Sequence, residues 1–368
     1  MAEDTLDSYE FTGRTIRRLL TWYEKAKRDL PWRQDRDPYH VWISEIMLQQ
    51  TRVAAVIDYY NRFMSELPDI SHLAGVEDER LMKLWEGLGY YNRARNLEKA
   101  AGLIMEEYGG RFPDEYEKIL ALPGIGAYTA GAIASVCFDA PTPAVDGNVL
   151  RVYTRLTGDD SCIDLDLTKR RIRENMLPLY ETCKKKERGT LTQSWMELGA
   201  TVCLPNGTPL CSVCPLRTEC RALREDRTCE LPVRAGKKAR KIEERTVFLL
   251  CTGDHVAMHR RPETGLLAGL WEFPNILGRL TMQEAVEQAE KWGLQPSAPR
   301  MEFPYTHIFS HVEWRMTAYY LQCEAMPEHI EEIGGIKWFH RDQPEEAAAV
   351  PSAFRPFLNL LKSSEEKL

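Results

Sequence analysis

Four cysteines are the feature of this sequence that most restricts how the chain can fold. Cys203, Cys211, Cys214 and Cys220 lie within eighteen residues, and the first gap contains both proline and glycine. Four thiolates this close together suit an iron–sulfur cluster or a zinc ion. Zinc sites usually use two short cysteine pairs, whereas a single short pair occurs here. Spacing alone leaves both metals open, and four unrelated buried thiols are the alternative.

Length and composition suggest a protein of two or three domains. The chain has 368 residues, of which 43% are hydrophobic and 28% charged, which is too long for one compact unit. No apolar run approaches the roughly 20 residues that span a bilayer, and the start, Met1 to Asp4, is acidic and unlike an export signal. We therefore expect a cytoplasmic protein that has no membrane partner and that is associated with the nucleoid if the source is bacterial. The other six cysteines are expected to be structural: Cys137, Cys162, Cys183, Cys229, Cys251 and Cys323.

The formal net charge of −7 argues mildly against a nucleic-acid partner, because binding to phosphates normally needs an excess of Lys and Arg. The one basic segment, residues 231–245, lies between two acidic parts of the chain. Any DNA binding must then depend on helix N-termini and a few well-placed cations.

Hydrophobic periodicity changes along the chain and divides it into two domains. From Thr15 to Arg224, apolar residues recur at helical spacing, which predicts an all-helical domain over residues 1–230. Residues 231–245 contain Pro, Gly and clustered charge and are predicted to be a linker. No internal repeat or low-complexity tract is visible.

The part after the linker, residues 246–368, has a different pattern. Runs rich in β-formers at Thr246 to Cys251 and Trp314 to Cys323 surround a predicted helix from Met282 to Trp292. This pattern indicates a smaller α+β domain.

A turn with two glycines separates two helical patterns at Leu122–Ala130. Gly124 and Gly126 allow a tight turn whose amides, with the following helix N-terminus, can hold a phosphate. About twenty residues later, Asp146 precedes a glycine at a predicted helix start, where an aspartate is ordinarily an N-cap. Taken alone, the turn is equally well explained as a plain helix connector, and a plain N-cap is the better explanation of Asp146.

In combination, the hairpin, the following aspartate and the four cysteines resemble the helix-hairpin-helix DNA glycosylase superfamily over residues 15–222. Leu30–Arg33, Val41–Thr51 and Trp85–Tyr91 are similar to the MutY branch of adenine glycosylases. The resemblance implies that the four cysteines hold a [4Fe-4S] cluster. The first cysteine gap is seven residues here and usually six in the family, a loop insertion that costs little free energy.

The resemblance also implies a mechanism with two carboxylates. Hydrolysis of an N-glycosidic bond places positive charge on the sugar and negative charge on the departing base. The family assigns Glu45 to protonate the adenine and Asp146 to stabilise the oxocarbenium-like sugar. Glu45 lies in an apolar helix, so we expect burial to raise its pKa, whereas Asp146, near backbone amides, should stay ionised.

Tyr128 distinguishes this branch from the related glycosylase–lyases of the endonuclease III type. Those enzymes have a lysine at the matching position, which forms a Schiff base with the sugar and promotes strand cleavage. Tyrosine cannot form that adduct, so the resemblance implies base excision without an efficient lyase step.

Further residues receive roles only through the resemblance. The target base must leave the duplex, and Gln50 and Tyr90 fill the space near the lesion while Thr51 contacts the opposite base. The remaining positions are expected to bind DNA or to hold the geometry of the active site: Arg33, Gly124, Gly126 and Asn148.

The C-terminal part resembles the Nudix-like domain that MutY proteins carry. The similarity lies in Gly265–Pro274 and in Phe309, Ser310 and His311. A Nudix hydrolase needs a helix with Arg-Glu followed by paired glutamates for Mg²⁺. Residues 283–288 lack the arginine and one glutamate, so hydrolase chemistry is expected to be lost. The resemblance gives Phe309, Ser310 and His311 the task of recognising 8-oxoguanine; the alternative is that Ser310 and His311 only close a turn.

Three interpretations of the whole chain follow. The favoured one is a monomeric adenine glycosylase that acts on double-stranded DNA with adenine opposite 8-oxoguanine or guanine. The second is an endonuclease III-like glycosylase–lyase, against which Tyr128 and the C-terminal domain both argue. The third is a DNA-binding protein without catalysis, which would need neither Glu45 nor Asp146.

Overall fold

The structure of the chain is a computed structural model that describes residues 13–236, 239–297, 301–324, 326–330, 333–341 and 349–363. The acidic start, Met1 to Asp4, lies outside the described residues. The chain forms two compact units. The first, called here the helical unit, contains Met1–Gly75 and Asn96–Gly236; the second, the sheet unit, contains Val76–Arg95 and Lys237–Leu368.

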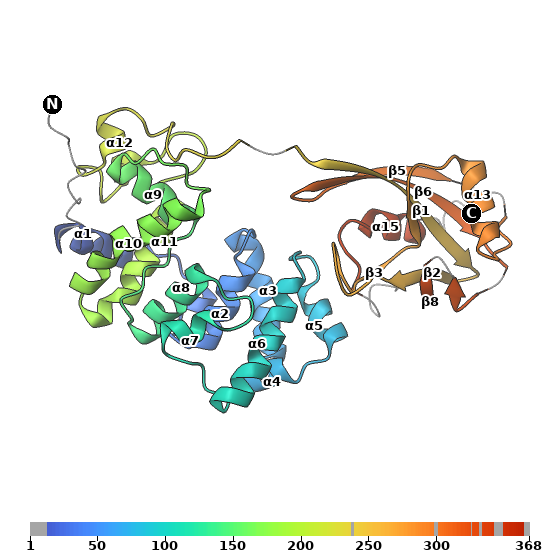
Figure 1. Cartoon of the computed structure of the whole chain (residues 1–368), viewed down its shortest axis with the longest axis horizontal. Helices are drawn as coiled ribbons and strands as arrows, with labels where there is room; N and C mark the ends of the chain where they lie inside the picture. Colours follow the sequence, from blue (N-terminus) through green and yellow to red (C-terminus); the bar gives the residue numbers. More distant parts are fainter. Residues whose placement is uncertain are drawn as a thin grey trace. The chain divides into compact units, whose positions relative to one another are not determined.

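The structure confirms the helical pattern predicted from residue 15 to residue 224 (Figure 1), but residues 76–95 of the predicted helical domain belong to the sheet unit. None of the helices in the described ranges is long and apolar enough to cross a bilayer. The α-helices are α1 (Gly13–Ala26), α2 (Pro38–Met47), α3 (Val53–Glu66), α4 (Ile70–Ala74), α6 (Asn92–Tyr108, which starts in the sheet unit), α7 (Tyr116–Leu120), α8 (Ala127–Phe138), α9 (Gly147–Thr157), α10 (Asp166–Thr182), α11 (Arg188–Thr201) and α12 (Arg221–Arg224). Short 3-10 helices are η1 (Pro31–Arg33), η2 (Lys185–Glu187) and η3 (Cys211–Val213).

One core of the helical unit joins α1, α9, α10 and α11. Leu19, Leu156, Met176 and Trp195, one from each helix, are buried in the same apolar cluster. Burial of side chains of this size stabilises the fold by about 1.5–3 kcal/mol each. Half-buried cysteines of the predicted cluster segment pack against this core, so the segment is fixed to α9 and α11: Cys203, Cys214 and Cys220.

The predicted hairpin connects α7 to α8. Gly124 has a φ of 75°, and a Cβ there would lie 2.6 Å from the Cβ of Asn96, so this position requires glycine. Gly126 has a φ of −97°, and nothing lies within 4 Å of where its Cβ would be. The turn therefore needs only one of the two glycines, while the other leaves open space at the N-terminus of α8.

A mixed sheet forms most of the sheet unit, with strand order β5-β6-β1-β2-β8-β7 and with β3 and β4 paired to β2 and β1. The long central strands β1 and β6 run parallel from the pair Lys241 and Val312 to the pair Cys251 and Gln322. The other neighbours are antiparallel. The strands are β1 (Lys241–Thr252), β2 (His255–Arg260), β3 (Trp271–Glu272), β4 (Asn275–Leu277), β5 (Glu302–Ile308), β6 (Val312–Gln322), β7 (His329–Ile330) and β8 (Gly334–His340).

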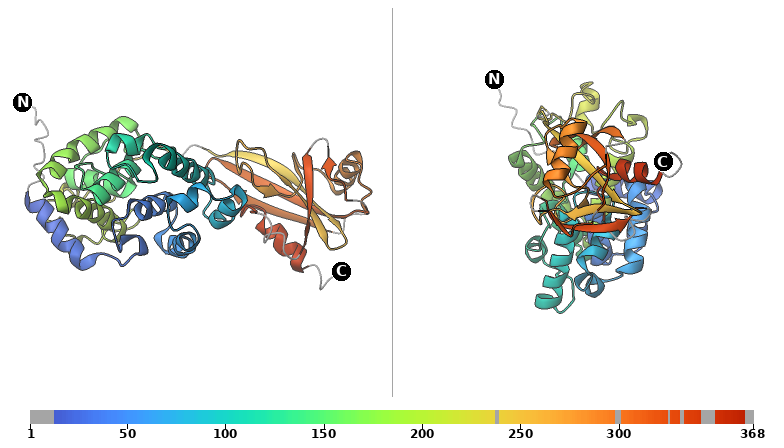
Figure 2. Two further views of the ribbon diagram at one scale, coloured as in Figure 1. Left: turned by 90° about the horizontal axis from the view of Figure 1, so that it is seen from below. Right: turned by 90° about the vertical axis from the view of Figure 1, so that its right-hand side faces the viewer.

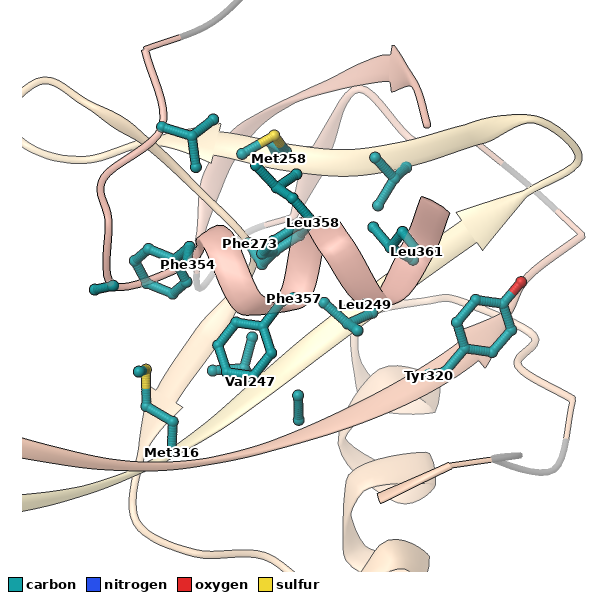
Figure 3. Packing of buried hydrophobic residues seen from close by; sticks show 14 of the residues in the cluster. Val247, Leu249, Met258, Phe273, Met316, Tyr320, Phe354, Phe357, Leu358 and Leu361 are labelled. Carbon is teal, nitrogen blue, oxygen red and sulfur yellow. The ribbon is translucent and has the colours of Figure 1, made fainter. Parts of the chain in front are cut away.

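Helices cover both faces of this sheet, as the alternation of apolar side chains requires. Val247 and Leu249 of β1 pack with Phe357 of α15 (Arg355–Ser363) on one face, which Figure 3 shows. Phe248 and Leu250 pack with α13 (Met282–Lys291) on the other. Figure 2 shows α15 against the sheet. The predicted strands and the predicted helix are thus confirmed as parts of β1, β6 and α13, and α5 (Asp78–Trp85) completes this unit.

The ends of the predicted linker, residues 231–245, are packed. Leu231 is buried, and its carbonyl accepts a hydrogen bond of 2.8 Å from Nε of Arg155. The amide of Ile163 donates to the carbonyl of Val233 at 3.0 Å. At the other end, Lys241 already belongs to β1 because that strand pairs with β6 over its first eleven residues.

Candidate active site

A cavity of about 620 Å³ opens in the helical unit between α2, α8, α11 and the N-terminus of α9. This volume lies within the range of about 300–1,000 Å³ for sites that bind small ligands. The charged residues of its wall are Arg28, Arg33, Glu45, Asp146 and Glu197. Both carboxylates predicted for catalysis therefore face one shared space.

Glu45 lies on α2, a helix in which Val41 to Met47 are all buried. Asp37 caps the start of this helix by accepting a hydrogen bond of 2.8 Å from the amide of Tyr39. Burial raises the pKa of the Glu45 carboxyl to about 7, although a hydrogen bond from Tyr128 acts in the opposite direction. Glu45 can therefore carry a proton near neutral pH, in agreement with the expectation from its apolar helix.

Tyr128 lies in the first turn of α8, directly after the hairpin. Its hydroxyl donates to Oε2 of Glu45 at 2.5 Å and lies 3.9 Å from the sulfur of Met196. Burial raises the pKa of the phenol well above its usual value, and the nearby carboxylates act in the same direction. The hydroxyl thus stays protonated and serves as a hydrogen-bond donor.

Asp146 is the N-cap of α9 and also part of the cavity wall. Its Oδ1 accepts from the amide of Val149 at 2.7 Å, and its Oδ2 accepts from the side-chain amide of Asn148 at 2.8 Å. Burial raises the pKa of Asp146 above its usual value, and the two hydrogen bonds only partly offset this rise. Asn148 is oriented in turn by Arg151, whose Nη2 donates to its Oδ1 at 2.8 Å. Asp146 therefore caps α9 and also presents its carboxylate to the cavity.

Other predicted residues of the helical unit surround the same cavity. Gln50, Thr51, Gly126 and Asn148 line it, whereas Gly124 lies in the hairpin next to Asn96. Gln50 is exposed and has a φ of 60°, a left-handed conformation that few residues other than glycine adopt.

Glu197 is a cavity residue that the sequence analysis did not single out. Its side chain, on α11, is completely buried and forms ion pairs with Arg28 and with the predicted residue Arg33. The signal was available: a lone glutamate stands between buried Trp195 and Leu198 in an apolar helix, just as Glu45 does in α2.

The sheet unit brings together the predicted residues Tyr90 and Ser310, whose hydroxyl groups form a hydrogen bond. The segment of Phe309, Ser310 and His311, called here the 309–311 loop, joins β5 to β6. The ring of Phe309 packs against Trp314 with centroids 4.9 Å apart, and its amide donates to the carbonyl of Val312 at 2.8 Å. Ser310 and His311 are exposed. Phe309 thus anchors the loop, and the next two side chains are exposed, with the hydroxyl of Ser310 bonded to Tyr90.

All four cysteines of the predicted cluster segment line one small cavity, together with Arg155 and Arg217. None of these four cysteines forms a disulfide bond. Nη1 of Arg155 lies 3.3 Å from the sulfur of Cys203. Among the described residues, no three His, Cys, Asp or Glu side chains are arranged around a point that could hold a single metal ion. The donor set, four soft sulfurs beside two cations, has the chemistry of an iron–sulfur cluster site.

The hairpin, the carboxylate that caps the helix after it and the cysteine segment define a helix-hairpin-helix base-excision fold. The family described as HhH-GPD superfamily base excision DNA repair protein matches residues 43–178, and the NUDIX domain family matches residues 246–360. A solved structure of a thermostable thymine-DNA glycosylase is similar with a TM-score of 0.51 and 29% identity, covering 57% of this chain and 95% of that one.

Similarity to curated proteins extends over both units. Adenine DNA glycosylase of Rattus norvegicus is 34% identical over 93% of this chain and 77% of its own length. Adenine DNA glycosylase of Buchnera aphidicola from Acyrthosiphon pisum is 31% identical over 89% of this chain and 92% of its own length. The chain therefore belongs to the adenine DNA glycosylase family of DNA N-glycosylases.

Proposed function

We propose that this protein initiates base excision repair by hydrolysing the N-glycosidic bond of adenine opposite 8-oxoguanine or guanine in duplex DNA, without an efficient strand-cleaving step. The observation that carries the proposal is the placement of Glu45 and Asp146, from α2 and the start of α9, on the wall of one cavity. Two carboxylates in unlike surroundings can divide the work of an acid and an anion.

Glu45 acts as the acid. Its pKa of about 7 lets a large fraction of the carboxyl carry a proton at neutral pH. Because Tyr128 donates to Oε2, the proton of Glu45 is available on Oε1 for a ring nitrogen of the adenine. Protonation converts the departing base from an anion to a neutral purine.

Asp146 stabilises the positive charge that develops on the sugar. Its carboxylate is fixed from one side by the amide of Val149 and from the other by Asn148, so it needs no reorganisation when the charge appears. The leaving base takes the proton of Glu45. Water then attacks the sugar and gives a proton to the Glu45 carboxylate, which restores the acid.

Tyr128 supports excision without a lyase step. A strand-cleaving glycosylase uses an amine to form a Schiff base with the sugar, and a phenol cannot do so. Trapping with borohydride on a duplex with adenine opposite 8-oxoguanine should therefore give no stoichiometric adduct at this position. A covalent adduct mapped to Tyr128 or its neighbours would contradict this part of the proposal.

We propose that the helical unit holds duplex DNA through the hairpin and the start of α8. Gly126 is the N-cap of α8 and has no side chain that could accept hydrogen bonds from the first backbone amides of this helix. A phosphate oxygen can accept those hydrogen bonds instead. Gln50, on the cavity wall, would fill the space left by the extruded base, and Thr51, on the same wall, would contact the base opposite it. Tyr90, in the sheet unit, is also proposed to lie near the lesion.

We propose that the 309–311 loop distinguishes 8-oxoguanine from guanine. The exposed hydroxyl of Ser310 and imidazole of His311 can read the altered donor and acceptor edge of the oxidised base. Replacing both, Ser310→Ala with His311→Ala, should reduce the preference for 8-oxoguanine over guanine about tenfold or more, since one good contact to a base is worth about 1–3 kcal/mol. An unchanged preference would remove the recognition role.

We propose that the four cysteines hold a [4Fe-4S] cluster, in keeping with the family and with four thiols that line one cavity. When bound, the cluster ties the segment from Cys203 to Cys220 together. The chain's own contribution is the contact of Arg155 with Cys203 and the packing of three of these cysteines against the helical core. We propose further that the protein acts on DNA as a monomer.

One assay tests the proposed function directly. Purified protein is given three duplexes, with adenine opposite 8-oxoguanine, with adenine opposite guanine and with an oxidised pyrimidine. Strand breaks are scored with and without alkali. We expect alkali-dependent breaks at adenine in the first two duplexes and none in the third, whereas alkali-independent cleavage of the third would identify a glycosylase–lyase.

A further inference from the structure

The 309–311 loop is the tip of the hairpin between β5 and β6, and its backbone is held at both ends. The amide of Phe309 donates to the carbonyl of Val312 at 2.8 Å, which leaves Ser310 and His311 as the two residues of the turn. The amide of Lys241, the first residue of β1, donates to the carbonyl of His311 at 3.1 Å. Of the three side chains of the loop, that of Phe309 packs inward and the other two are exposed.

Trp314, on β6, is the surface on which Phe309 rests. The indole is buried, and the two rings meet edge to face, with an angle of 71° between their planes. The ring of His307, on β5 just before the loop, contacts Phe309 with centroids 4.5 Å apart. Aromatic pairs prefer particular geometries, so the position of Phe309 depends on the orientation of the indole.

The indole of Trp314 is oriented by charged neighbours. The guanidinium of Arg245 lies over its ring at 4.1 Å from the centroid, and that of Arg261 at 5.6 Å. At its polar edge, Nε1 of Trp314 donates to Oε2 of Glu243 at 3.0 Å. Cations attracted to the ring face and an acceptor at the ring edge together restrict rotation of the side chain.

Each of the two arginines is fixed in turn by a carboxylate. Nη2 of Arg245 donates to Oε2 of Glu243 at 3.0 Å, and Nη1 of Arg261 donates to both oxygens of the buried Glu272, at 2.8 and 2.7 Å. The two arginine side chains are only 14% and 15% exposed. Such ion pairs cost desolvation free energy and contribute direction more than stability. A tryptophan that served the core alone would need only apolar neighbours.

We propose that Trp314 is a positioning residue for the discrimination between 8-oxoguanine and guanine: held by the two arginines, it fixes Phe309 and so presents the next two side chains of the loop in one arrangement. The proposal rests on the proposed function, because it concerns the reading of the same base by the same loop. It assigns Trp314 no contact with DNA. A loop that has to be ordered during binding loses part of the free energy of its contacts and can adapt to either base.

The test is the preference ratio, defined as the single-turnover rate of adenine excision opposite 8-oxoguanine divided by the rate opposite guanine. In Trp314→Leu the ratio should fall about fivefold, the factor that corresponds to one well-placed aromatic pair. Trp314→Phe keeps a ring beneath Phe309 and should retain most of the ratio. Arg245→Met removes the nearer cation and keeps the indole, so the ratio should fall about twofold. This variant carries the test if Trp314→Leu does not fold.

Two further variants separate positioning from loss of structure. In a protein that already carries Ser310→Ala and His311→Ala, Trp314→Leu should change the ratio no further, because the side chains to be positioned are gone. The matched control is Trp292→Leu, since this tryptophan packs against Phe248 on the other face of the same sheet, with centroids 4.6 Å apart. It should lower the melting temperature and leave the ratio unchanged.

Three results would overturn the positioning role: an unchanged ratio in Trp314→Leu and Arg245→Met, an equal fall in the protein without the two exposed side chains, or an equal fall in Trp292→Leu. An unchanged ratio on replacing Ser310 and His311 themselves would instead overturn the proposed recognition by the loop, so the two failures are distinguishable.

Discussion

Two walls of one cavity each present a buried glutamate, and the two have opposite properties. On α2, burial with a single phenol as partner raises the pKa of Glu45 to about 7. On α11, burial also acts to raise the pKa of Glu197, but the ion pairs with Arg28 and Arg33 outweigh it, and the pKa is lowered. The partners of a buried carboxyl, and not its burial, decide whether it keeps a proton. One wall carries a carboxyl that can hold a proton near neutral pH, and the other carries a carboxylate that binds two cations.

The largest expected effect comes from removing the acid. Glu45→Gln keeps the shape of the side chain but carries no ionisable proton, so excision should slow by about 10³-fold, within the range for general acid catalysis. Single-turnover rates with the 8-oxoguanine duplex measure this. The fold is checked by thermal unfolding. A rate within tenfold of the unsubstituted protein would mean that the two walls do not differ in function as described.

Asp146→Asn should have the next largest effect. Asparagine caps a helix about as well as aspartate, so the melting temperature should change little. The loss of negative charge at the sugar should slow excision about 10²-fold to 10³-fold, as for other groups that stabilise a developing charge. The combination of normal stability and slow excision distinguishes a catalytic carboxylate from a plain cap. If stability falls and the rate does not, Asp146 is only a cap.

The two glutamates should affect stability with opposite dependence on pH. The folded pKa of Glu45 lies above its usual value of 4.5, so its contribution to stability is lost as pH rises from about 4.5 to about 7, by roughly 3 kcal/mol. The folded pKa of Glu197 is lowered, so its contribution is present above its usual pKa and is lost as pH falls.

Urea unfolding at pH 8 measures this contrast. Glu45→Gln should be at least as stable as the unsubstituted protein, whereas Glu197→Gln should lose about 3–5 kcal/mol because it breaks two ion pairs of a buried carboxylate and leaves two partly buried arginines without it. Equal destabilisation by both substitutions would remove the distinction.

Tyr128→Phe should give the smallest effect. The phenol lowers the pKa of Glu45 by donating to its carboxylate, so its removal should move the alkaline limb of the pH–rate profile upward by less than about one pH unit. The rate at neutral pH should stay within about tenfold, and thermal unfolding serves as the control. A downward shift would mean that Tyr128 does not act on Glu45 through this bond.

Elements of the fold were predictable where the signal is local. The helices between Thr15 and Arg224 and the strands around Val247 and Trp314 follow from periodicity, because helices and strands bury side chains at different spacing. The start of β1 at Lys241 was not predictable. It depends on pairing with β6, some seventy residues later in the chain, where Lys241 meets Val312.

The candidate site divides in the same way. Glu45, Tyr128 and Asp146 were predictable because their motifs resemble a known family. Glu197 had the same local signal as Glu45, a lone glutamate among buried neighbours, but its ion pairs were not predictable because Arg28 and Arg33 are 169 and 164 residues away in the chain. The contact of Tyr90 with Ser310 spans 220 residues and became visible only in the folded chain.

The central claim is that Glu45 gives its proton to an adenine held beside Asp146. Its most direct test is the pH profile of single-turnover excision for the unsubstituted protein and for Glu45→Gln. We predict a rate that declines above about pH 7 in the unsubstituted protein and a slow rate without this decline in Glu45→Gln. The same decline in both proteins would contradict the claim, because the titrating acid would then lie elsewhere.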